Sequence, residues 1–372
     1  MAIEFTSIRR ASRNDREDYL EIFDQRLVHS DYISGEDVAH FEREFADYLG
    51  VSSVVSCGNG SDALLIALKC LNLPKNAKVL VPDFTFLAAA EAVASLGLIP
   101  ILVDIDKETL TITAETLKCC WDKDVAAVIV VHLFGYAAPM DDIVALCKKN
   151  GAYLIEDCAQ ATGTKIRYNN KWCHVGTIGD IGATSFFPTK NLSAMGDGGA
   201  IFTSNHSLAQ RAQMFKSHGA LNKYTPVCIG QNSRLDTLQA AILRYRLKKI
   251  DIQIEKCQRI ALKYDIAFAQ LPMITIPQRS NDVFHSFHQY PILIHNGSRD
   301  NLQAYLKDEG IPSMVYYPLP LSKTEAYQDY SPYESAVSLA IGTQILCLPI
   351  HAYLDESEVN SIITKIVQFY EE

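Results

Sequence analysis

Short apolar runs alternate with helical patterns through the first two thirds of the chain. The runs are rich in Val, Ile and Leu and lie at residues 54–57, 78–82, 99–105, 126–132 and 152–157. Between them, apolar residues recur at helical spacing over residues 61–71, 85–97, 114–120 and 140–151. This alternation predicts an α/β fold with a mainly parallel sheet that is covered by helices on both faces. Such a sheet binds ligands at the carboxyl ends of its strands.

The pattern changes after residue 235. A long helical stretch over 235–268 precedes predicted strands at 288–295, 312–318 and 344–350 and predicted helices at 300–310 and 357–370. This composition favours a smaller α+β domain. We therefore predict a large domain over residues 1–250, which includes the N-terminal segment, and a small C-terminal domain over residues 251–372.

Composition narrows the class of protein. The 372 residues are 48% hydrophobic, and 34 Lys plus Arg against 43 Asp plus Glu give a net charge of -9. No basic run could follow a phosphate backbone, so we expect no nucleic-acid partner. The charged opening, residues 1–17, lacks the apolar core of a secretory signal, which predicts a cytoplasmic protein. The most apolar stretch, 125–135, is too short for a membrane span and contains His132, so we expect a buried strand and no membrane partner.

The cysteines and histidines do not indicate a metal site. The 10 Cys residues are scattered without a C-x-x-C pair, and we expect most of them to be small buried hydrophobic residues. His285 and His288 lie three residues apart, but no third ligand is near them in sequence. The sequence therefore predicts no metal.

A glycine-containing turn follows the first predicted strand. Gly58, Asn59 and Gly60 lead into a helix that we expect to start at Ser61 or Asp62. Glycines let the backbone approach an anion, and the helix N-terminus favours a phosphate. The alternative is an ordinary helix start that Ser61 caps.

Polar side chains also follow the predicted strand at 152–157. Glu156, Asp157 and Gln160 lie where a parallel sheet exposes its functional residues. A carboxylate there could cap a turn or pair with an arginine. It could also keep a heterocyclic nitrogen protonated by stabilising its charged form.

Lys190 lies in the stretch ATSFFPTKNLSAMGDGGA, residues 183–200, which is poor in charge. Such a lysine could be structural, or it could be a nucleophile, because burial lowers the pKa of an amine. An anion site, a carboxylate for a pyridine nitrogen and an amine for a Schiff base together favour pyridoxal phosphate as the cofactor.

Several longer motifs resemble the DegT/DnrJ/EryC1/StrS family of pyridoxal-phosphate-dependent nucleotide-sugar aminotransferases. These motifs are GNGSDAL, VPDFTFLAAAE, IEDCAQ, SFFPTKNLSAMGDGGA and GQNSRLDTLQAAIL, with VYYPLPLSKTEAY and LCLPIHAYL near the C-terminus. The resemblance covers nearly the whole chain. It implies the fold of type I pyridoxal-phosphate transferases.

The resemblance also implies roles for individual residues around the cofactor ring. Lys190 matches the Schiff-base lysine, and Asp157 matches the carboxylate that meets the pyridine nitrogen. Gln160 matches a residue near the ring and its hydroxyl. Phe86 matches the aromatic residue that stacks on the ring, where relatives often have Tyr or Trp; phenylalanine keeps the π face and lacks only the polar group.

Other matched positions concern the phosphate and the partner subunit. Gly60, Ser61 and Ser185 match phosphate contacts of the family. Asn232 matches an asparagine that reaches the phosphate from the neighbouring subunit, which implies a homodimer with shared active sites.

The substrate side is less strongly marked. Arg234 matches a position near the substrate, and the alternative is a helix-capping ion pair with Asp236. Tyr316 and Tyr317 fall where relatives present an aromatic residue or a histidine to the sugar. Because an alternating strand would turn only one of them inward, we favour Tyr317.

The activity that the resemblance implies is transfer of an amino group from L-glutamate, through pyridoxamine phosphate, to a nucleotide-linked keto sugar. The residues of the NSRLDTLQAAIL and YYPLPL motifs favour a 3-keto sugar on UDP or dTDP, and they leave amination at C4 open. The product would be an aminosugar for a polysaccharide, glycan or secondary metabolite. Alternatives are a sugar dehydratase, in which histidine replaces the lysine, a desulfurase that would use Cys158, and a regulatory protein that binds cofactor or sugar nucleotide without turnover.

Overall fold

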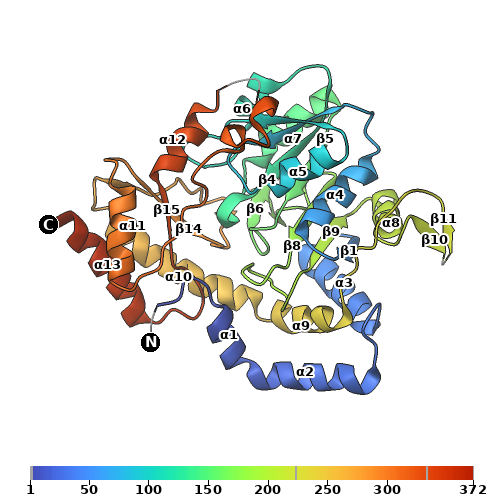
Figure 1. Ribbon diagram of the computed structural model, residues 1–372, viewed down its shortest axis with the longest axis horizontal. Coiled ribbons are helices and arrows are strands. Elements are labelled where there is room, and N and C mark those ends of the chain that lie inside the picture. The colour runs from blue at the N-terminus through green and yellow to red at the C-terminus, as the bar shows by residue number, and fades with distance from the viewer. Residues whose placement is uncertain (1–2, 223, 332–333, 372) are drawn as a thin grey trace.

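The computed structural model describes residues 3–222, 224–331 and 334–371 (Figure 1). Seven strands form the central sheet: β1 (Ser53–Cys57), β2 (Lys78–Pro82), β3 (Ile99–Val103), β4 (Val125–Val131), β5 (Tyr153–Asp157), β8 (Ile181–Ser185) and β9 (Gly199–Thr203). Their order is β1-β9-β8-β5-β4-β2-β3. β9 runs opposite to the other six strands, which share one direction, so the prediction of an α/β fold with a mainly parallel sheet is confirmed.

The helices of this part of the chain are α3 (Glu36–Leu49), α4 (Gly60–Leu71), α5 (Ala88–Ser95), α6 (Ala114–Cys120), α7 (Met140–Asn150), α8 (His206–Phe215) and α9 (Thr237–Leu247). The strand β4 is apolar along its whole length, as expected of a strand that is covered on both faces. The helix α4 is also mostly apolar, because it packs between the sheet and the helices α5 and α8. These buried runs hold the carboxyl ends of the parallel strands at one edge of the sheet.

A second core lies in the C-terminal part of the chain. The strands β12 (Ile274–Thr275), β14 (Tyr290–Ile294) and β15 (Ile345–Leu348) form an antiparallel sheet. The helices α10 (Ile250–Phe268), α11 (Arg299–Asp308) and α13 (Glu356–Glu371) pack with this sheet around a separate apolar cluster. Ile250 and Ile254 of α10 belong to the first core, whereas Cys257 and Ile260 belong to the second. The division at residue 250 stays a prediction.

Two small sheets complete the fold. The strands β6 (Lys165–Tyr168), β7 (Lys171–His174) and β13 (Val283–Phe284) join the two parts of the chain. The strands β10 (Ala220–Asn222) and β11 (Thr225–Pro226) form a hairpin that projects from the molecule in Figure 1. A short 3-10 turn at Leu133–Gly135 follows β4.

Two details of the expected C-terminal part are wrong. The helical stretch 235–268 is broken between α9 and α10 at Lys248 and Lys249. The segment 312–318 is not a strand, because only an isolated bridge between Met314 and Cys347 forms there.

After that bridge the chain returns to the large core. The 3-10 turns Leu321–Lys323 and Gln328–Tyr330 and the helix α12 (Ala336–Gln344) follow. Asp83 accepts hydrogen bonds from the backbone and hydroxyl of Ser322, and Asp104 accepts them from Val337 and Ser338. Asp83, which is buried, and Asp104, which is partly buried, follow β2 and β3 and therefore connect a C-terminal segment to the central sheet.

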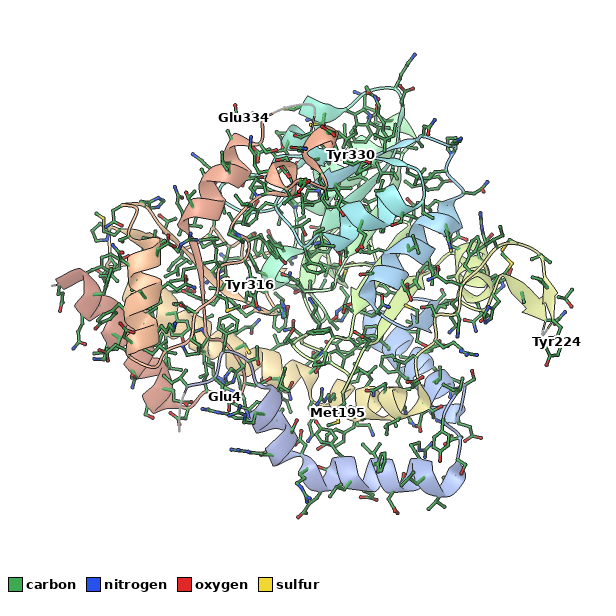
Figure 2. The ribbon with its side chains drawn as sticks, in the orientation of Figure 1. Glu4, Met195, Tyr224, Tyr316, Tyr330 and Glu334 are labelled. Atoms are coloured by element: carbon green, nitrogen blue, oxygen red, sulfur yellow. The ribbon has the colours of Figure 1, made fainter. Side chains whose placement is uncertain are left out.

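The N-terminal helices α1 (Ile8–Asn14) and α2 (Arg16–His29) connect distant parts of the chain (Figure 1). Figure 2 shows Glu4 beside the C-terminal part, and the carbonyl of Glu4 accepts a hydrogen bond from His351. Arg10 forms a bidentate pair with Glu358 of α13. Glu4 and Arg10 thus bind the N-terminal segment to His351 and to α13.

Two absences are stated for the described residues only. No helix among them is long and apolar enough to cross a membrane. Within the same residues, no group of three or more His, Cys, Asp or Glu side chains could hold a metal ion. Six of the 10 cysteines are buried, namely Cys57, Cys70, Cys147, Cys158, Cys257 and Cys347.

Candidate active site

A cavity of about 750 Å³ opens at the carboxyl ends of the parallel strands. It is lined by residues that follow β1, β2, β5 and β8, which is where a parallel sheet binds ligands. The lining residues that the sequence singled out are Gly60, Ser61, Phe86, Asp157, Gln160, Ser185, Lys190 and Tyr317. Eight predicted positions from across the chain therefore share one cavity.

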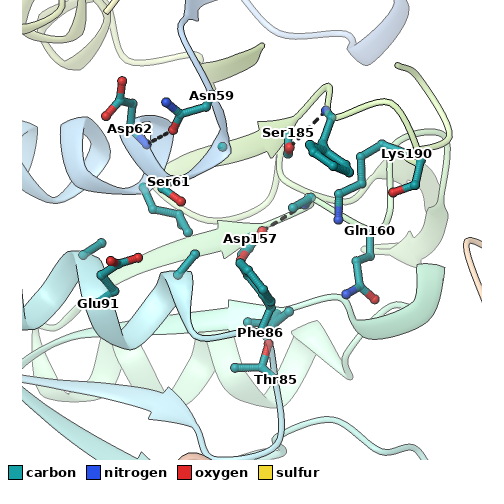
Figure 3. A pocket seen from close by; sticks show the side chains of 18 of the residues that line it. Asn59, Ser61, Asp62, Thr85, Phe86, Glu91, Asp157, Gln160, Ser185 and Lys190 are labelled. Atoms are coloured by element: carbon teal, nitrogen blue, oxygen red, sulfur yellow. Dashed lines mark hydrogen bonds between the residues drawn. The ribbon is translucent and has the colours of Figure 1, made fainter. Parts of the chain in front are cut away.

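The start of α4 forms one wall of this cavity (Figure 3). The helix begins at Gly60, and the side chain of Asn59 accepts a hydrogen bond from the Asp62 amide at 2.8 Å. The alternative in which Ser61 caps the helix is therefore wrong, because Asn59 is the capping residue and the helix begins before Ser61. Ser61 is exposed and lines the cavity instead. The first amides of α4 can serve an anion.

Gly60 and Ser185 lie against each other at this wall. A Cβ atom on Gly60 would come within 2.6 Å of the Ser185 Cβ and 3.1 Å of its Oγ. The Ser185 Oγ accepts a hydrogen bond from the Phe187 amide at 3.2 Å, so its hydroxyl proton can be donated elsewhere. A larger residue at position 60 would therefore displace Ser185, whose hydroxyl borders the cavity beside the first amides of α4. We call Gly60, Ser61 and Ser185 the anion cradle.

Asp157 ends β5 and points into the cavity (Figure 3). Its Oδ1 accepts one hydrogen bond, from the Ala159 amide at 2.9 Å, and no other described residue donates to its carboxylate. Burial raises the pKa of Asp157, while the Ala159 amide, Lys190 and His132 act in the opposite direction. A buried carboxylate with a free oxygen suits a cationic N–H of a ligand.

Glu156, the preceding residue, has a different environment. Its carboxylate accepts hydrogen bonds from the His132 ring and from the amides of Gly176, Ile178 and Gly179. The His132 Nδ1 accepts a hydrogen bond from the Ala138 amide, so Nε2 is the ring nitrogen that donates to Glu156. Burial raises the pKa of Glu156, but these donors outweigh it and the net shift is downward. Glu156 is saturated and structural.

Lys190 lies in the loop between β8 and β9 and is partly buried. Burial lowers the pKa of its amine from 10.5 to about 8, although Asp157 acts in the opposite direction. No described residue accepts a hydrogen bond from the amine. A fraction of Lys190 is therefore neutral near pH 8, and this form is the nucleophile.

Gln160 and two aromatic residues line the cavity beside Lys190. The Gln160 side chain accepts from the Phe134 amide at 2.7 Å and donates to the Tyr317 hydroxyl at 3.1 Å. The Phe86 ring is 53% exposed and lies 6.5 Å from the Tyr317 ring, centroid to centroid. Because about half of the Phe86 side chain is exposed, its ring can stack on a planar ligand.

The sequence profile of the DegT/DnrJ/EryC1/StrS aminotransferase family matches residues 13–367. The chain belongs to this family.

Individual relatives agree with this assignment. A pleiotropic regulatory protein of Geobacillus stearothermophilus is 37% identical over 355 residues, covering 94% of both chains. The UDP-2-acetamido-2-deoxy-3-oxo-D-glucuronate aminotransferase of Pseudomonas aeruginosa is 37% identical over 340 residues, covering 90% of this chain and 91% of the relative. The crystal structure of NtdA from Bacillus subtilis, with bound cofactor PMP, has a TM-score of 0.92 at 28% identity and covers 100% of this chain and 86% of that chain.

These comparisons confirm the resemblance that the motifs indicated. At the level of the DegT/DnrJ/EryC1/StrS family, the predictions of fold, aminotransferase activity and a pyridoxal phosphate cofactor are confirmed. The roles of single residues stay predictions. The desulfurase alternative loses its nucleophile, because Cys158 is buried and burial raises the pKa of its thiol.

Two predicted site residues lie outside the cavity of this chain. Asn232 and Arg234 are exposed and do not line it. Ser233 between them accepts from the Gly58 amide and donates to Asp62, so the segment is bound next to the start of α4. Within the described part of the chain Arg234 makes no ion pair, so the capping pair with Asp236 does not form.

The cavity also contains residues to which the motifs assigned no role. They include Thr85, Glu91, Asp197, His288 and Gln289. Tyr316 and Tyr317 both line the cavity, so the expectation that only one faces inward is wrong: the segment is not a strand and does not alternate. The sequence indicates His288 only as a possible metal ligand. Packing of the second core places His288 in the cavity, and no sequence pattern predicts that position.

Proposed function

We propose that this protein is a pyridoxal-phosphate-dependent aminotransferase that transfers an amino group from glutamate to a keto group of a nucleotide-linked hexose. One observation carries the proposal. A single cavity combines Lys190, whose pKa is lowered to about 8, with the free carboxylate oxygen of Asp157 and with the anion cradle.

The lining residues fit the parts of this cofactor. The amides at the start of α4 and the hydroxyls of Ser61 and Ser185 would hold its phosphate. Asp157 would pair with its ring nitrogen, and the exposed face of Phe86 would cover its ring. When bound, the cofactor supplies a carbonyl group that accepts an amine and a ring that withdraws electrons. The residues supply its binding and orientation.

Lys190 has two tasks in this proposal. Its neutral amine attaches the cofactor, and after an amino donor has displaced it, the free amine moves a proton. In the first half-reaction it takes the proton from the Cα of glutamate. In the second it gives a proton to the sugar carbon that receives nitrogen. A pKa of about 8 suits both directions near neutral pH.

The hexose is proposed to be a 3-keto sugar. The support is the Pseudomonas aeruginosa relative, whose name specifies a 3-oxo sugar on UDP. Tyr316, Tyr317 and Glu91 are the lining residues that we assign to the sugar side. The cavity is larger than a cofactor alone requires, which leaves room for such a substrate.

We further propose a homodimer in which Asn232 and Arg234 of one subunit complete the cavity of the other. Their exposure, next to a bound backbone segment at the start of α4, supports this assignment. Among the described residues, Lys190 is the only lysine or arginine that lines the cavity. A sugar nucleotide carries a diphosphate, so a cation from a second subunit would balance its charge.

The direct test is an absorbance titration. Glutamate should convert the spectrum of the bound pyridoxal form into that of pyridoxamine phosphate, and one keto sugar from a UDP- and dTDP-linked panel should reverse the change. Lys190→Ala should abolish both half-reactions. Steady-state turnover by Lys190→Ala would refute the proposal.

A regulatory role is the second candidate, because one relative is named a pleiotropic regulatory protein. In that case the protein would bind the cofactor, but glutamate would leave the spectrum unchanged and no keto sugar of the panel would be aminated. The same titration therefore separates the two functions.

A further inference from the structure

The loop that carries Lys190 is closed by its own backbone. It leaves the sheet after Phe186, and the Ala194 amide donates back to the Phe186 carbonyl at 2.7 Å. Inside this loop the Lys190 amide donates to the Phe187 carbonyl at 2.8 Å. The orientation of Lys190 therefore depends on what holds the returning limb, residues 193–195.

One arginine of α9 holds most of this limb. The Arg246 Nη1 donates to the Ser193 carbonyl at 2.8 Å, to the Ser193 hydroxyl at 2.6 Å and to the Ala194 carbonyl at 3.3 Å. Ser193 and Ala194 are both buried, so water cannot readily replace these bonds. Arg246 forms no ion pair with any described carboxylate. Its guanidinium instead donates hydrogen bonds to Ser193 and Ala194 of the loop.

The guanidinium is itself held from the other side by α2. The Arg246 Nε donates to the Tyr19 hydroxyl at 3.0 Å, and the guanidinium carbon lies 5.2 Å from the centre of the Tyr19 ring. Tyr19 is buried, and its hydroxyl also lies 3.4 Å from a carboxylate oxygen of Asp15, which pairs with Lys249. This arrangement leaves Arg246 little rotational freedom.

A second residue of α9 holds the same limb two turns earlier. The Met195 amide donates to the Gln239 side chain at 2.7 Å, and Figure 2 shows Met195 beside this helix. Gln239 and Arg246 are seven residues apart, so they lie on one face of the helix. Directly after the lysine, the Asn191 side chain donates to the Ser286 carbonyl at 3.1 Å. The segment that follows Lys190 is thus held at several points.

We propose that Arg246, oriented by Tyr19, is a positioning residue that fixes the Lys190 loop and so sets the environment of the lysine amine. Arg246 does not line the cavity, and it acts only through Ser193 and Ala194. The catalytic part of this inference rests on the proposed function. The structural part concerns the chain alone.

Only an arginine can make these bonds together. Its planar fork directs Nη1 to two carbonyls and a hydroxyl while Nε reaches Tyr19. A lysine would keep the charge but could not bond the loop and Tyr19 in this geometry. Arg246→Lys is therefore expected to be intermediate between wild type and Arg246→Gln.

The test compares Arg246→Gln and Arg246→Lys with Arg244→Gln. Arg244 lies on the same helix and loses bonds to Asp37 and Glu44 that do not involve the loop. In cofactor-free protein, the pH dependence of Lys190 labelling by an amine reagent reports its pKa. We expect this pKa to rise from about 8 toward 10.5 in Arg246→Gln, less in Arg246→Lys, and not in Arg244→Gln.

Kinetics supply the second readout. In the holoenzyme we expect Arg246→Gln to lower kcat by about tenfold to a hundredfold with a smaller change in KM. A loosened loop would move the Lys190 amine away from its reactive position, whereas the residues that bind the substrate would stay in place. If Arg246→Gln does not fold, Tyr19→Phe and Arg246→Lys carry the same comparison.

An unchanged Lys190 pKa in the Arg246 variants, or an equal shift in Arg244→Gln, would overturn the proposal. The labelling experiment uses neither glutamate nor a keto sugar. Failure of the proposed aminotransferase activity would leave it unaffected, so the two failures can be distinguished.

Discussion

Glu156 and Asp157 have the same charge and are adjacent, yet their surroundings assign them different tasks. Glu156 is fully buried and has four donors, whereas Asp157 has one amide and a free oxygen in the cavity. A saturated carboxylate stabilises the fold, and an unsaturated one at a cavity can bind a ligand. The difference depends on the donors and not on the residue type.

Exchange of each carboxylate for its amide should separate these tasks. Asp157→Asn should lower kcat by about a hundredfold or more, since it removes a charge from a ligand site, and should change stability little. Glu156→Gln should instead lower the free energy of unfolding by about 1–3 kcal/mol, because it places an NH2 group against backbone amides. Kinetics and urea unfolding measure the two effects. Equal losses of stability in both variants would contradict this view.

The lowered pKa of Lys190 also predicts how stability depends on pH. The folded protein disfavours the protonated amine, so the buried charge costs stability below pH 8, and the cost disappears as pH rises from about 8 to 10.5. Cofactor-free Lys190→Met should therefore be more stable than wild type at pH 7 by about 3 kcal/mol. The difference should shrink above pH 8. Thermal unfolding over pH 7 to 10.5 checks this, and a constant difference would contradict it.

At the scale of elements, the start of α4 combines two functions in one turn. Asn59 completes the helix cap, which releases Ser61 and the glycine amide for a ligand. The close contact of Gly60 with Ser185 ties the helix to the end of β8. The anion cradle therefore lies where the start of α4 contacts the end of β8, and its shape depends on a glycine at position 60.

Gly60→Ala should weaken cofactor binding by about tenfold or more, because its Cβ would displace Ser185 from the cradle. The helix itself should be no less stable, since alanine is a better helix former than glycine. Gly196→Ala is the matched control, because a Cβ there would meet only Gln239 at 3.5 Å. Fluorescence titration with pyridoxal phosphate measures both. Equal affinity of the two variants would show that the cradle does not hold the phosphate.

At the scale of the whole molecule, the N-terminal segment joins the two apolar cores. Ile3 packs on the second core, while α2 lies against α9 of the large part of the chain. Arg10 and Glu358 connect the segment to α13, and their side chains are 16% and 10% exposed. Such a partly buried, bidentate pair contributes more than a surface ion pair does.

Arg10→Met should therefore lower the free energy of unfolding at pH 7 by about 2 kcal/mol. The hydrogen bond from Arg10 is the main cause of the lowered pKa of Glu358, whose ordinary value is 4.5. The contribution is present above pH 4.5 and is lost as pH falls through the lower folded value. Arg9→Met is the control, because Arg9 is 72% exposed. Urea unfolding at pH 7 and pH 3.5 should show a larger difference at pH 7 than at pH 3.5.

The proposed homodimer predicts complementation between inactive variants. Lys190→Ala and Asn232→Ala subunits, mixed after dissociation, should form a heterodimer with one intact site and one doubly altered site. Activity should rise from near zero toward the level that one intact site per heterodimer supplies. If the mixture stays inactive although differently tagged subunits co-purify as heterodimers, Asn232 does not act across subunits.

Local pattern was sufficient for much of this protein. Apolar runs and helical spacing predicted the parallel sheet, because a strand buried on both faces needs apolar residues along its length. The motifs around Gly60, Asp157 and Lys190 predicted the cofactor and the family. Each motif lies within a few consecutive residues at the end of a strand, so its chemistry can be recognised without knowledge of the tertiary structure.

Only the tertiary structure decided which residues act together. Asn59 rather than Ser61 caps α4, both tyrosines at 316 and 317 face the cavity, and the segment after Met314 returns to the large core. Arg246 meets Ser193 across 53 residues of sequence. Periodicity reports how each segment is buried, but a hydrogen-bond partner is chosen by packing between segments. The sequence therefore determined the fold and the chemistry, and the packing decided the geometry of the site.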